Sequence, residues 1–267
     1  MEMNNYCLIG NPVKHSLSPI IHNFFIFNSK INAGYVAFEV DERDFENFVK
    51  FLRLNFDGFN ITLPYKQKIF KYLDEVDDVA YEIGAVNCVK VSDGKLTGFN
   101  TDYYGIVKTF ELFNVDLFDK EIVVVGCGGA ARPLFYYLKG KPYKNLIILN
   151  RTVEKAEKVA SEFELEKVKI ISLSHLEIIN NCDIIINASS IGLDNGVFMN
   201  LKLSVNDFAF DMQYKLNGLT PFLKEVEVDK KSDGIYMLIL QAIKSFEIWN
   251  NKSYNFDIKK IIKHIEG

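Results

Sequence analysis

Residues 121–138 read EIVVVGCGGAARPLFYYL, and residues 145–151 read NLIILNR. The run of β-branched residues from Ile122 to Val125 leads directly into three glycines, Gly126, Gly128 and Gly129. Such a run is typical of a buried parallel strand that ends in a tight turn. The two stretches therefore predict one complete unit of strand, turn, helix and strand.

The glycines of this unit predict half of a dinucleotide-binding site. Gly126 would form the turn, and Gly128 would let backbone N–H groups approach a pyrophosphate at the N-terminus of the next helix. Ala130 and Ala131 fill the third small position and still allow close packing of helix on strand. Pro133 falls in the first helical turn, where its missing N–H costs little.

The end of the second strand indicates which dinucleotide is bound. An NAD enzyme places an acid there for the ribose 2′-hydroxyl. This chain has Asn150, Arg151 and Thr152 and no carboxylate before Glu154, a set that suits a ribose 2′-phosphate. We therefore predict NADP; the alternative is that Arg151 is only a solvated charge at a strand end.

Composition narrows the class of protein. The 267 residues, 48% hydrophobic and 25% charged, suffice for one large or two ordinary domains. A formal charge of −4 gives no reason to expect a nucleic-acid partner, and no 18-residue apolar run suggests a membrane span. The start, MEMNNYCLIGNP, lacks the basic region of a signal peptide, and the 4 cysteines are scattered, without the spacing of a metal site. We expect a cytoplasmic protein with reduced thiols, no metal, and a monomeric or homodimeric state that the sequence does not decide.

The first hundred residues alternate strands and helices. Strands are expected at 6–10, 35–40 and 58–63, and a hairpin at 86–100 about the turn Ser92-Asp93-Gly94. One helix would begin with Ser18 as N-cap and Pro19 at its first position. Others would span 42–55 and begin at Pro64.

The remainder predicts an α/β fold with a doubly wound parallel sheet. Further strands are expected at 168–173, 183–187 and 208–212, alternating with helices. A strongly apolar helix after Gly234 and a last amphipathic helix have no strand to follow, so we expect them to return to the first domain. The expected domains are 1–101 for substrate binding and catalysis, 102–234 for a Rossmann-like NADP domain, and 235–267 for the returning helices.

Several polar residues of the first domain could carry chemistry, although each has an ordinary structural reading. Ser16 and Ser18 could be a turn residue and a helix cap, and Asp102 a cap of the next helix. Asn60 and Thr62 share a face of one strand. Lys66 would lie in the first turn of a helix, where a cation is unfavourable and a functional demand would explain it.

Together these residues match a family pattern. The motifs GNPxxHSxSPxxHN, GxNxTxPxK, GAVN, GxNTDxxG, GxGGAARP, NRT and GxxMLxxQA occur in this order across almost the whole chain. In them the chain closely resembles the shikimate dehydrogenases, which reduce 3-dehydroshikimate to shikimate with NADPH on the route to chorismate and the aromatic amino acids.

The resemblance implies a role for each matching residue. Lys66 and Asp102 would be the catalytic pair, and Ser16 and Ser18 would hold the substrate carboxylate. The ring hydroxyls would be bound by Asn60, Thr62, Asn87, Asp102 and Gln241. The nicotinamide would lie against Met237 and the backbone of Gly234, with Ser189, Ile191 and Tyr214 as the inner wall; Tyr214 would also touch the substrate. The cofactor set is then Gly126, Gly128, Gly129, Ala130, Asn150, Arg151, Thr152, Ser189, Ile191, Gly234 and Met237.

The chain departs from the family pattern at two places, and two other functions are alternatives to shikimate dehydrogenase activity with NADP. Cys88 stands where the family usually has threonine, and the segment after Tyr214 is one residue longer than usual. An NAD-dependent quinate and shikimate dehydrogenase would prefer an acid near Arg151. A nonenzymatic NADP(H)-binding regulator would be free to lose Lys66 and Asp102, because a fold alone does not fix a function.

Overall fold

The structure, a computed structural model, describes residues 3–193, 196–199 and 204–267, without the side chains of 176–178. The chain divides into two compact units. Unit 1 comprises Met1–Gly105 and Leu238–Gly267, and unit 2 comprises Ile106–Met237. The chain passes from one unit to the other within two helices, α4 (Thr101–Leu112) and α8 (Ile235–Asn250).

Unit 1 contains a mixed sheet with the order β2-β1-β3-β5-β6-β4. Parallel pairs join β1 (Asn4–Gly10) to β2 (Ala33–Glu39) and to β3 (Gly58–Ile61). The antiparallel hairpin of β5 (Cys88–Ser92) and β6 (Lys95–Phe99) extends the sheet, and the short β4 (Glu75–Val76) closes it. The predicted hairpin is confirmed; its turn residues Asp93 and Gly94 have φ of 51° and 72°.

Alternate residues of the central strands face different helices. Phe59 and Ile61 belong to a core with Phe45, Val49 and Leu52 of α2 (Phe45–Asn55). Gly58 lies on the other face, where an added Cβ would lie 2.4 Å from the indole of Trp249 in α8. The same face receives α1 (Ser18–Ser29), and α9 (Ile258–Glu266) packs on α1 through His264 and Phe24, with ring centroids 5.0 Å apart. The predicted return of the C-terminal helices to the first domain is confirmed; the remaining helix of unit 1 is α3 (Asp78–Ile83).

Two predicted helix starts in unit 1 are wrong. Leu17, and not Ser18, is the N-cap of α1, so Ser18 is the first helical residue. No helix begins at Pro64; a short 3-10 helix, η1 (Lys68–Tyr72), begins four residues later. Lys66 lies in a turn before it, so the predicted conflict with a helix dipole does not arise.

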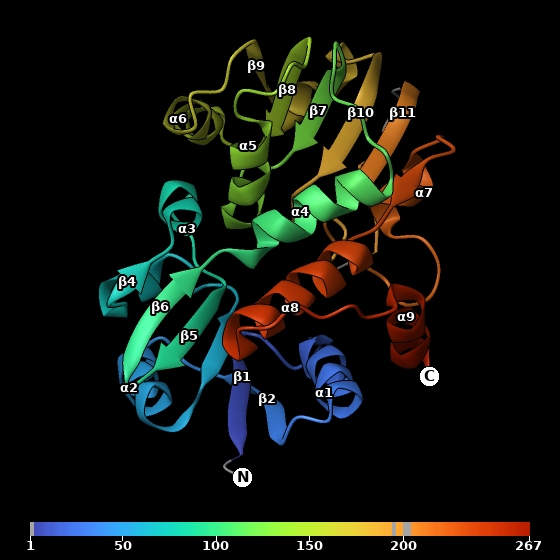
Figure 1. The fold of residues 1–267 in the computed structure, drawn as a ribbon. Coiled ribbons are helices and arrows are strands. Elements are labelled where there is room, and N and C mark those ends of the chain that lie inside the picture. The colour runs from blue at the N-terminus through green and yellow to red at the C-terminus, as the bar shows by residue number, and fades with distance from the viewer. Residues whose placement is uncertain (1–2, 194–195, 200–203) are drawn as a thin grey trace. The chain divides into compact units, whose positions relative to one another are not determined.

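Unit 2 contains the predicted doubly wound sheet, visible in Figure 1 through the arrows β9, β8, β7, β10 and β11. Its order is β12-β11-β10-β7-β8-β9 and all pairs are parallel. The strands are β7 (Glu121–Val125), β8 (Asn145–Asn150), β9 (Val168–Ser172), β10 (Asn181–Asn187), β11 (Ser204–Asp211) and β12 (Lys231–Ser232). The order reverses between β7 and β10, the point at which such sheets bind ligands.

The continuous apolar run of β7 is explained by helices on both faces of this sheet. Ile122 and Val124 pack with α4, α5 (Arg132–Leu138) and α6 (Val153–Glu162). Val123 and Val125 pack with Phe222 and Leu223 of α7 (Pro221–Glu225) on the opposite face. A parallel strand buried on both faces needs apolar residues at every position. Two 3-10 turns, η2 (Gly129–Ala131) and η3 (Leu173–Ile178), complete the unit.

Candidate active site

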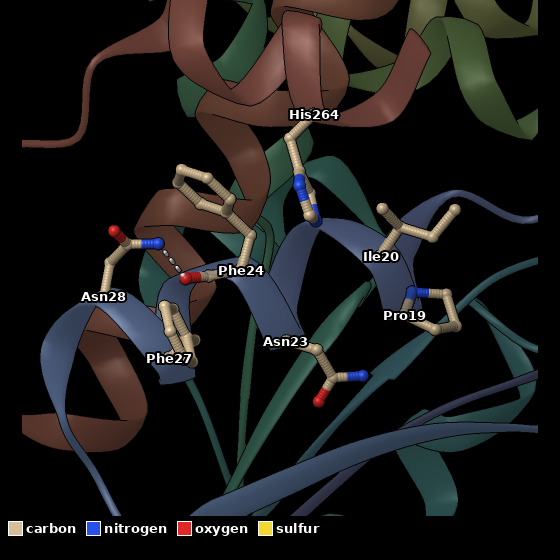
Figure 2. A pocket seen from close by; sticks show the side chains of 7 residues that line it. All are labelled: Pro19, Ile20, Asn23, Phe24, Phe27, Asn28 and His264. Carbon is tan, nitrogen blue, oxygen red and sulfur yellow. Dashed lines mark hydrogen bonds between the residues drawn. The ribbon is translucent and has the colours of Figure 1, made fainter. Parts of the chain in front are cut away.

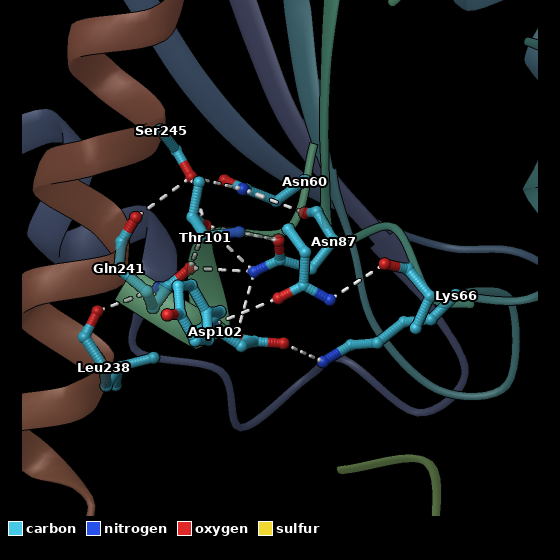
Figure 3. A network of polar contacts seen from close by, with 11 residues as sticks. Asn60, Lys66, Asn87, Thr101, Asp102, Leu238, Gln241 and Ser245 are labelled. Atoms are coloured by element: carbon cyan, nitrogen blue, oxygen red, sulfur yellow. Dashed lines mark hydrogen bonds and ion pairs between the residues drawn. The ribbon is translucent and has the colours of Figure 1, made fainter. Parts of the chain in front are cut away.

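The centre of the candidate site in unit 1 is an ion pair between Lys66 and Asp102 (Figure 3). The Lys66 ammonium lies 2.7 Å from Asp102 Oδ2, with side chains 18% and 13% exposed. Asp102 Oδ1 accepts a hydrogen bond of 2.9 Å from Asn87 Nδ2. Both carboxylate oxygens are therefore engaged, one by a cation and one by an amide, which fixes the carboxylate that holds the ammonium.

A buried polar network extends from Asn87. Its Oδ1 accepts the backbone N–H of Thr101 at 2.6 Å, and its Nδ2 lies 3.0 Å from Thr101 Oγ1 and 3.3 Å from Gln241 Oε1. Asn60 joins from β3, donating to the Asn87 carbonyl at 3.1 Å and to Ser245 Oγ at 3.0 Å. The structure thus brings together Asn60, Lys66, Asn87, Asp102 and Gln241, five residues that the sequence proposed for substrate binding or catalysis.

Local structure leaves Asp102 available for this role. Asn100 precedes α4, and its Oδ1 accepts the N–H of Tyr103 at 3.1 Å, as an N-cap residue does. The sequence offered a cap as the ordinary reading of Asp102; in the structure Asn100 is the cap. Asp102 lies in the first helical turn, where a negative charge is favoured.

The two serines lie at the start of α1. Ser16 Oγ accepts the backbone N–H of Ser18 at 3.2 Å, and Ser18 is 7% exposed. The hydroxyl of Ser18 is not used to cap the helix. Ser16 therefore meets one backbone N–H at the start of the helix, while the Ser18 hydroxyl interacts with Tyr35 and caps no helix.

Two other proposed substrate residues have separate surroundings, each described within its own unit. Thr62 follows the end of β3, and its Cγ2 would lie 2.3 Å from a Cβ added at Gly10, so a glycine is required beside it. Tyr214 belongs to unit 2, where it is partly exposed after β11.

Sequence reasoning missed two members of the network, Thr101 and Ser245. Thr101 Oγ1 lies 3.2 Å from Gln241 Oε1 and 3.0 Å from Ser245 Oγ. Thr101 directly precedes Asp102, and Ser245 follows Gln241 by one helical turn, so its hydroxyl donates to the Gln241 carbonyl at 3.0 Å. The helical spacing of four residues was the available signal for Ser245.

In unit 2, the glycines of the glycine-rich turn are needed for two different reasons. Gly126 has φ of 94°, and an added Cβ would lie 2.9 Å from the Cβ of Ser189, so both conformation and space demand glycine. A Cβ added at Gly128 or Gly129 would meet nothing within 4 Å. Packing within the protein does not explain glycine there, whereas close approach of a ligand to the backbone would.

The polar residues after β8 lie at the surface. Arg151 and Thr152 are exposed, and Asn150 Nδ2 donates to the Thr152 carbonyl at 2.8 Å. Arg132, the arginine that follows the glycines, has a different environment: it is 8% exposed, forms a two-pronged pair with Glu162 and lies 5.0 Å from the Phe163 ring centroid. This pair lowers the pKa of Glu162. Arg132 therefore stabilises unit 2, and Arg151 is the guanidinium presented to solvent.

The loop after β10 is held by a second, partly buried network. Ser189 Oγ donates to Asn187 Oδ1 at 2.7 Å, and Gln213 Nε2 donates to the carbonyls of Ser189 and Ile191, both at 2.9 Å. Gly234 donates its N–H to the Gln213 carbonyl at 2.8 Å, and an added Cβ there would lie 2.4 Å from the Met212 carbonyl oxygen. The predicted nicotinamide residues Ser189, Ile191 and Gly234 are thus linked through Gln213.

Asp211 anchors this network at the end of β11. Its Oδ1 accepts from Asn187 Nδ2 at 2.9 Å and from the Gln213 N–H at 3.0 Å, while the carboxyl group is fully buried. Burial raises the pKa of Asp211 to about 6, and its hydrogen bonds only partly oppose the rise.

A separate pocket lies on the outer side of α1, shown in Figure 2. Its volume is about 500 Å³, and it is lined by Pro19, Ile20, Asn23, Phe24, Phe27, Asn28 and His264. It contains none of the proposed substrate, catalytic or cofactor residues. Among the residues described, no cluster of three metal-ligating side chains occurs, and no helix is long and apolar enough to cross a membrane.

Comparison with known protein families gives two matches that follow one another along the chain. Residues 8–89 match the shikimate dehydrogenase substrate binding domain, and residues 109–198 match the shikimate / quinate 5-dehydrogenase family. The first match contains Ser16, Ser18, Asn60, Lys66 and Asn87. The second contains the glycine-rich turn and Arg151.

Individual relatives are similar over nearly their whole length. The shikimate dehydrogenase (NADP(+)) of Methanococcus maripaludis is 42% identical over 266 residues, covering 96% of this chain and 95% of the relative. That of Aquifex aeolicus is 38% identical, covering 98% and 97%. The crystal structure of shikimate 5-dehydrogenase from Thermus thermophilus in complex with NADP(H) and shikimate is 28% identical, with a TM-score of 0.85 and 98% of both chains covered.

Proposed function

The chain belongs to the shikimate dehydrogenase family, and from this membership we propose that it catalyses the NADPH-dependent, reversible reduction of 3-dehydroshikimate to shikimate. This reaction supplies chorismate and aromatic amino acid biosynthesis. The observation that carries the proposal is the Lys66–Asp102 pair, 2.7 Å apart and set in a network of amide and hydroxyl groups that suits a polyhydroxylated ring. Substrate binding is proposed for unit 1, Met1–Gly105 with Leu238–Gly267, and NADP binding for unit 2, Ile106–Met237.

Lys66 is proposed as the proton donor. NADPH, when bound, supplies a hydride to the ketone carbon, so negative charge develops on the ketone oxygen. A positioned ammonium stabilises that charge and gives the oxygen a proton. In the reverse direction the neutral lysine accepts the proton of the shikimate hydroxyl.

Asp102 is proposed to orient this lysine and to bind a neighbouring ring hydroxyl. Asn87 holds the second carboxylate oxygen at 2.9 Å, which keeps the carboxylate from rotating away from Lys66. Asn60, Thr62, Asn87 and Gln241 are proposed to bind ring hydroxyls, Ser16 and Ser18 the substrate carboxylate, and Tyr214 the substrate edge.

The residues of unit 2 fit NADP. Backbone approach at Gly128 and Gly129 is unobstructed, since even an added Cβ would meet no protein atom within 4 Å. The exposed Arg151, flanked by Asn150 and Thr152, suits the 2′-phosphate. Ser189, Ile191, Gly234 and Met237 are proposed to hold the nicotinamide.

A steady-state comparison tests the function. Shikimate and quinate are each supplied with NADP and with NAD, and formation of the reduced cofactor is followed by absorbance. Shikimate with NADP should give the highest kcat/KM. A preference for quinate with NAD would favour the broader dehydrogenase, and no turnover despite NADPH binding would favour the nonenzymatic regulator.

The cellular location, the partners and the oligomeric state of the enzyme are also proposals. All four cysteines are buried free thiols, which supports a reducing, cytoplasmic location. The net charge of −4 supports a small-molecule substrate without a nucleic-acid partner. A monomer or a homodimer is expected, to be decided by sedimentation.

A further inference from the structure

Asn60 has its amide orientation fixed by its neighbours. Its Nδ2 lies 3.1 Å from the backbone carbonyl of Asn87, which can only accept a hydrogen bond, so the nitrogen must face that carbonyl. The second amide proton goes to Ser245 Oγ at 3.0 Å, and that hydroxyl donates onward to the Gln241 carbonyl. Both amide protons of Asn60 are therefore used within the protein.

The remaining atom, Asn60 Oδ1, faces the hydroxyl of Tyr35 at 2.9 Å. Because an amide oxygen only accepts, the tyrosine must donate. One lone pair of Oδ1 is thereby occupied and one remains. A ligand can then only donate a hydrogen bond to Asn60.

Tyr35 is held in place by two consecutive residues of α1, His22 and Asn23. Its backbone pairs in both directions with the side chain of Asn23, at 2.9 and 3.1 Å. Its ring stacks on His22, with centroids 4.2 Å apart and planes 5° from parallel. It is 2% exposed. The His22-Asn23 pair at the end of the GNPxxHSxSPxxHN motif therefore holds Tyr35 in place.

We infer that Tyr35 is a positioning residue: the Asn87 carbonyl sets which way the Asn60 amide faces, and the Tyr35 hydroxyl holds the amide oxygen in place as a hydrogen-bond acceptor, so that this position of the site selects a ring hydroxyl and rejects a group that can only accept. The inference rests on the proposed function, in which Asn60 binds a ring hydroxyl. Tyr35 itself need not touch the substrate. Burial raises the pKa of Tyr35 well above its usual value, and a contact from the Ser18 hydroxyl only partly offsets the rise, so the phenol keeps its proton.

The test compares Tyr35→Phe with Tyr6→Phe. Tyr6 is a matched control: it is 1% exposed, stacks on Trp249 with centroids 4.7 Å apart, and its hydroxyl lies 3.4 Å from Asn250 Oδ1. Tyr35→Phe should raise the shikimate KM about five-fold, as expected for the loss of one hydrogen bond, with kcat within about two-fold and NADP KM unchanged. Tyr6→Phe should leave all three constants unchanged.

Combination with Asn60→Ala tests whether the effect acts through Asn60. Adding Tyr35→Phe to Asn60→Ala should raise KM no further. Equal KM changes in the two tyrosine variants, or an unchanged KM with a lower Tm in Tyr35→Phe, would show that Tyr35 only packs. An inactive parent chain would contradict the proposed function instead, so the two failures are distinguishable.

If Tyr35→Phe does not fold, shikimate analogues test the inference on the parent chain. Each ring hydroxyl that is not oxidised is replaced in turn by hydrogen and by fluorine, which can accept but not donate. At one position both analogues should raise KM alike, because Asn60 has no proton to offer. If the fluorine compounds bind as well as shikimate at every position, Asn60 is not held as an acceptor and the inference is wrong.

Discussion

At the scale of single residues, small differences in environment distinguish a lysine proposed for catalysis from an ordinary surface lysine. Lys66 and Lys68 each pair with a carboxylate, but Lys66 is 18% exposed and its partner Asp102 is fixed by Asn87, whereas Lys68 is 41% exposed and its partner Glu42 is 77% exposed. An exposed pair contributes little and reorganises freely. The buried pair keeps one geometry, which a positioned acid requires.

Lys66→Ala should reduce kcat by about 10² to 10⁴, the usual contribution of a positioned acid. Shikimate KM should change much less, because the interaction counts mainly in the transition state. Steady-state kinetics at saturating substrate measure both. Lys68→Ala, two residues away, is the control and should keep kcat. A Lys66→Ala enzyme within a few-fold of the parent would remove Lys66 from the mechanism.

Arg151→Ala should weaken NADPH binding by about 2 kcal/mol, the size of a lost charge-assisted contact, and leave the poorer NADH binding nearly unchanged. Fluorescence titration with both cofactors measures the difference. Lys158→Ala, which removes another exposed cation of the same segment, should affect neither cofactor. Equal losses for NADPH and NADH in Arg151→Ala would mean that Arg151 does not read the phosphate.

At the scale of elements, helix starts place the functional groups. Asn100 caps α4 and leaves Asp102 one residue inside the helix, and Ser16 satisfies the Ser18 N–H at the start of α1. In both cases a neighbouring polar residue meets the backbone requirement. The residue expected to bind the substrate therefore does not have to satisfy a backbone N–H group.

The start of α1 gives a prediction that separates the two serines. Ser18→Ala should raise the shikimate KM with little change in Tm, because the Ser18 hydroxyl caps no helix. Ser16→Ala should also lower stability, by about 1 kcal/mol, because Ser16 Oγ accepts a helical N–H. Thermal unfolding and kinetics on the same samples decide it. If Ser18→Ala lowers Tm and leaves KM alone, Ser18 has no place in the site.

Much of the fold was predictable because it depends on local patterns. The apolar run of β7, the glycines after it and the Asp93-Gly94 turn each have one common structural meaning, and the strands and hairpin they predicted are present. The helix predicted at Pro64 failed because a distant group intervenes: Val86 donates its N–H to the Lys66 carbonyl at 2.9 Å, which holds that segment in a turn.

The polar network was less predictable because its contacts join residues that are far apart in the sequence. Tyr35 reaches Asn60 because β1 lies between β2 and β3, pairing Tyr6 with both Tyr35 and Gly58. No spacing along the sequence encodes that proximity. Asn100 and Asp102 were equally good cap candidates by residue type, and only the hydrogen bond from Tyr103 distinguishes them.

At the scale of the whole molecule, each unit carries a buried titratable group, and the two pKa values are shifted in opposite directions. His22 in unit 1 is fully buried, and neither ring nitrogen has a hydrogen-bond partner of ordinary geometry among the described residues, so the nearby Asn60 side chain opposes only a small part of the effect of burial. Burial lowers its pKa to about 3. Asp211 in unit 2 has its pKa raised to about 6. Both groups therefore favour the neutral form in the folded state.

The consequences for stability differ in sign. As pH falls from 6.5 toward 3, the unfolded chain protonates His22 while the folded chain does not, so stability falls by about 1.4 kcal/mol per pH unit. As pH falls from about 6 to 3.8, the folded chain protonates Asp211 first, so stability rises. In this interval the contribution of His22 therefore destabilises unit 1 as pH falls, whereas the contribution of Asp211 stabilises unit 2.

Two variants measure these contributions separately by denaturant unfolding. His22→Phe keeps a ring against Tyr35 and should flatten the loss of stability between pH 6.5 and pH 4. Asp211→Asn keeps an acceptor for Asn187 and Gln213, and it should raise stability at pH 7 while leaving it unchanged at pH 3.5. An acid slope that is the same in the parent and in His22→Phe would show that His22 does not titrate as described.

The two crossings of the chain between units, within α4 and α8, have a consequence for biosynthesis on the ribosome. Unit 1 lacks Trp249, Gln241 and α9 until its last segment, Leu238–Gly267, has been translated, whereas all of unit 2 is made before that segment. Nascent domains fold once their residues are complete. The second unit should therefore fold first, reversing the usual N-terminal priority. Stalled nascent chains that expose residues up to Met237 should resist protease within the helices and strands of unit 2 and be cut within the first hundred residues.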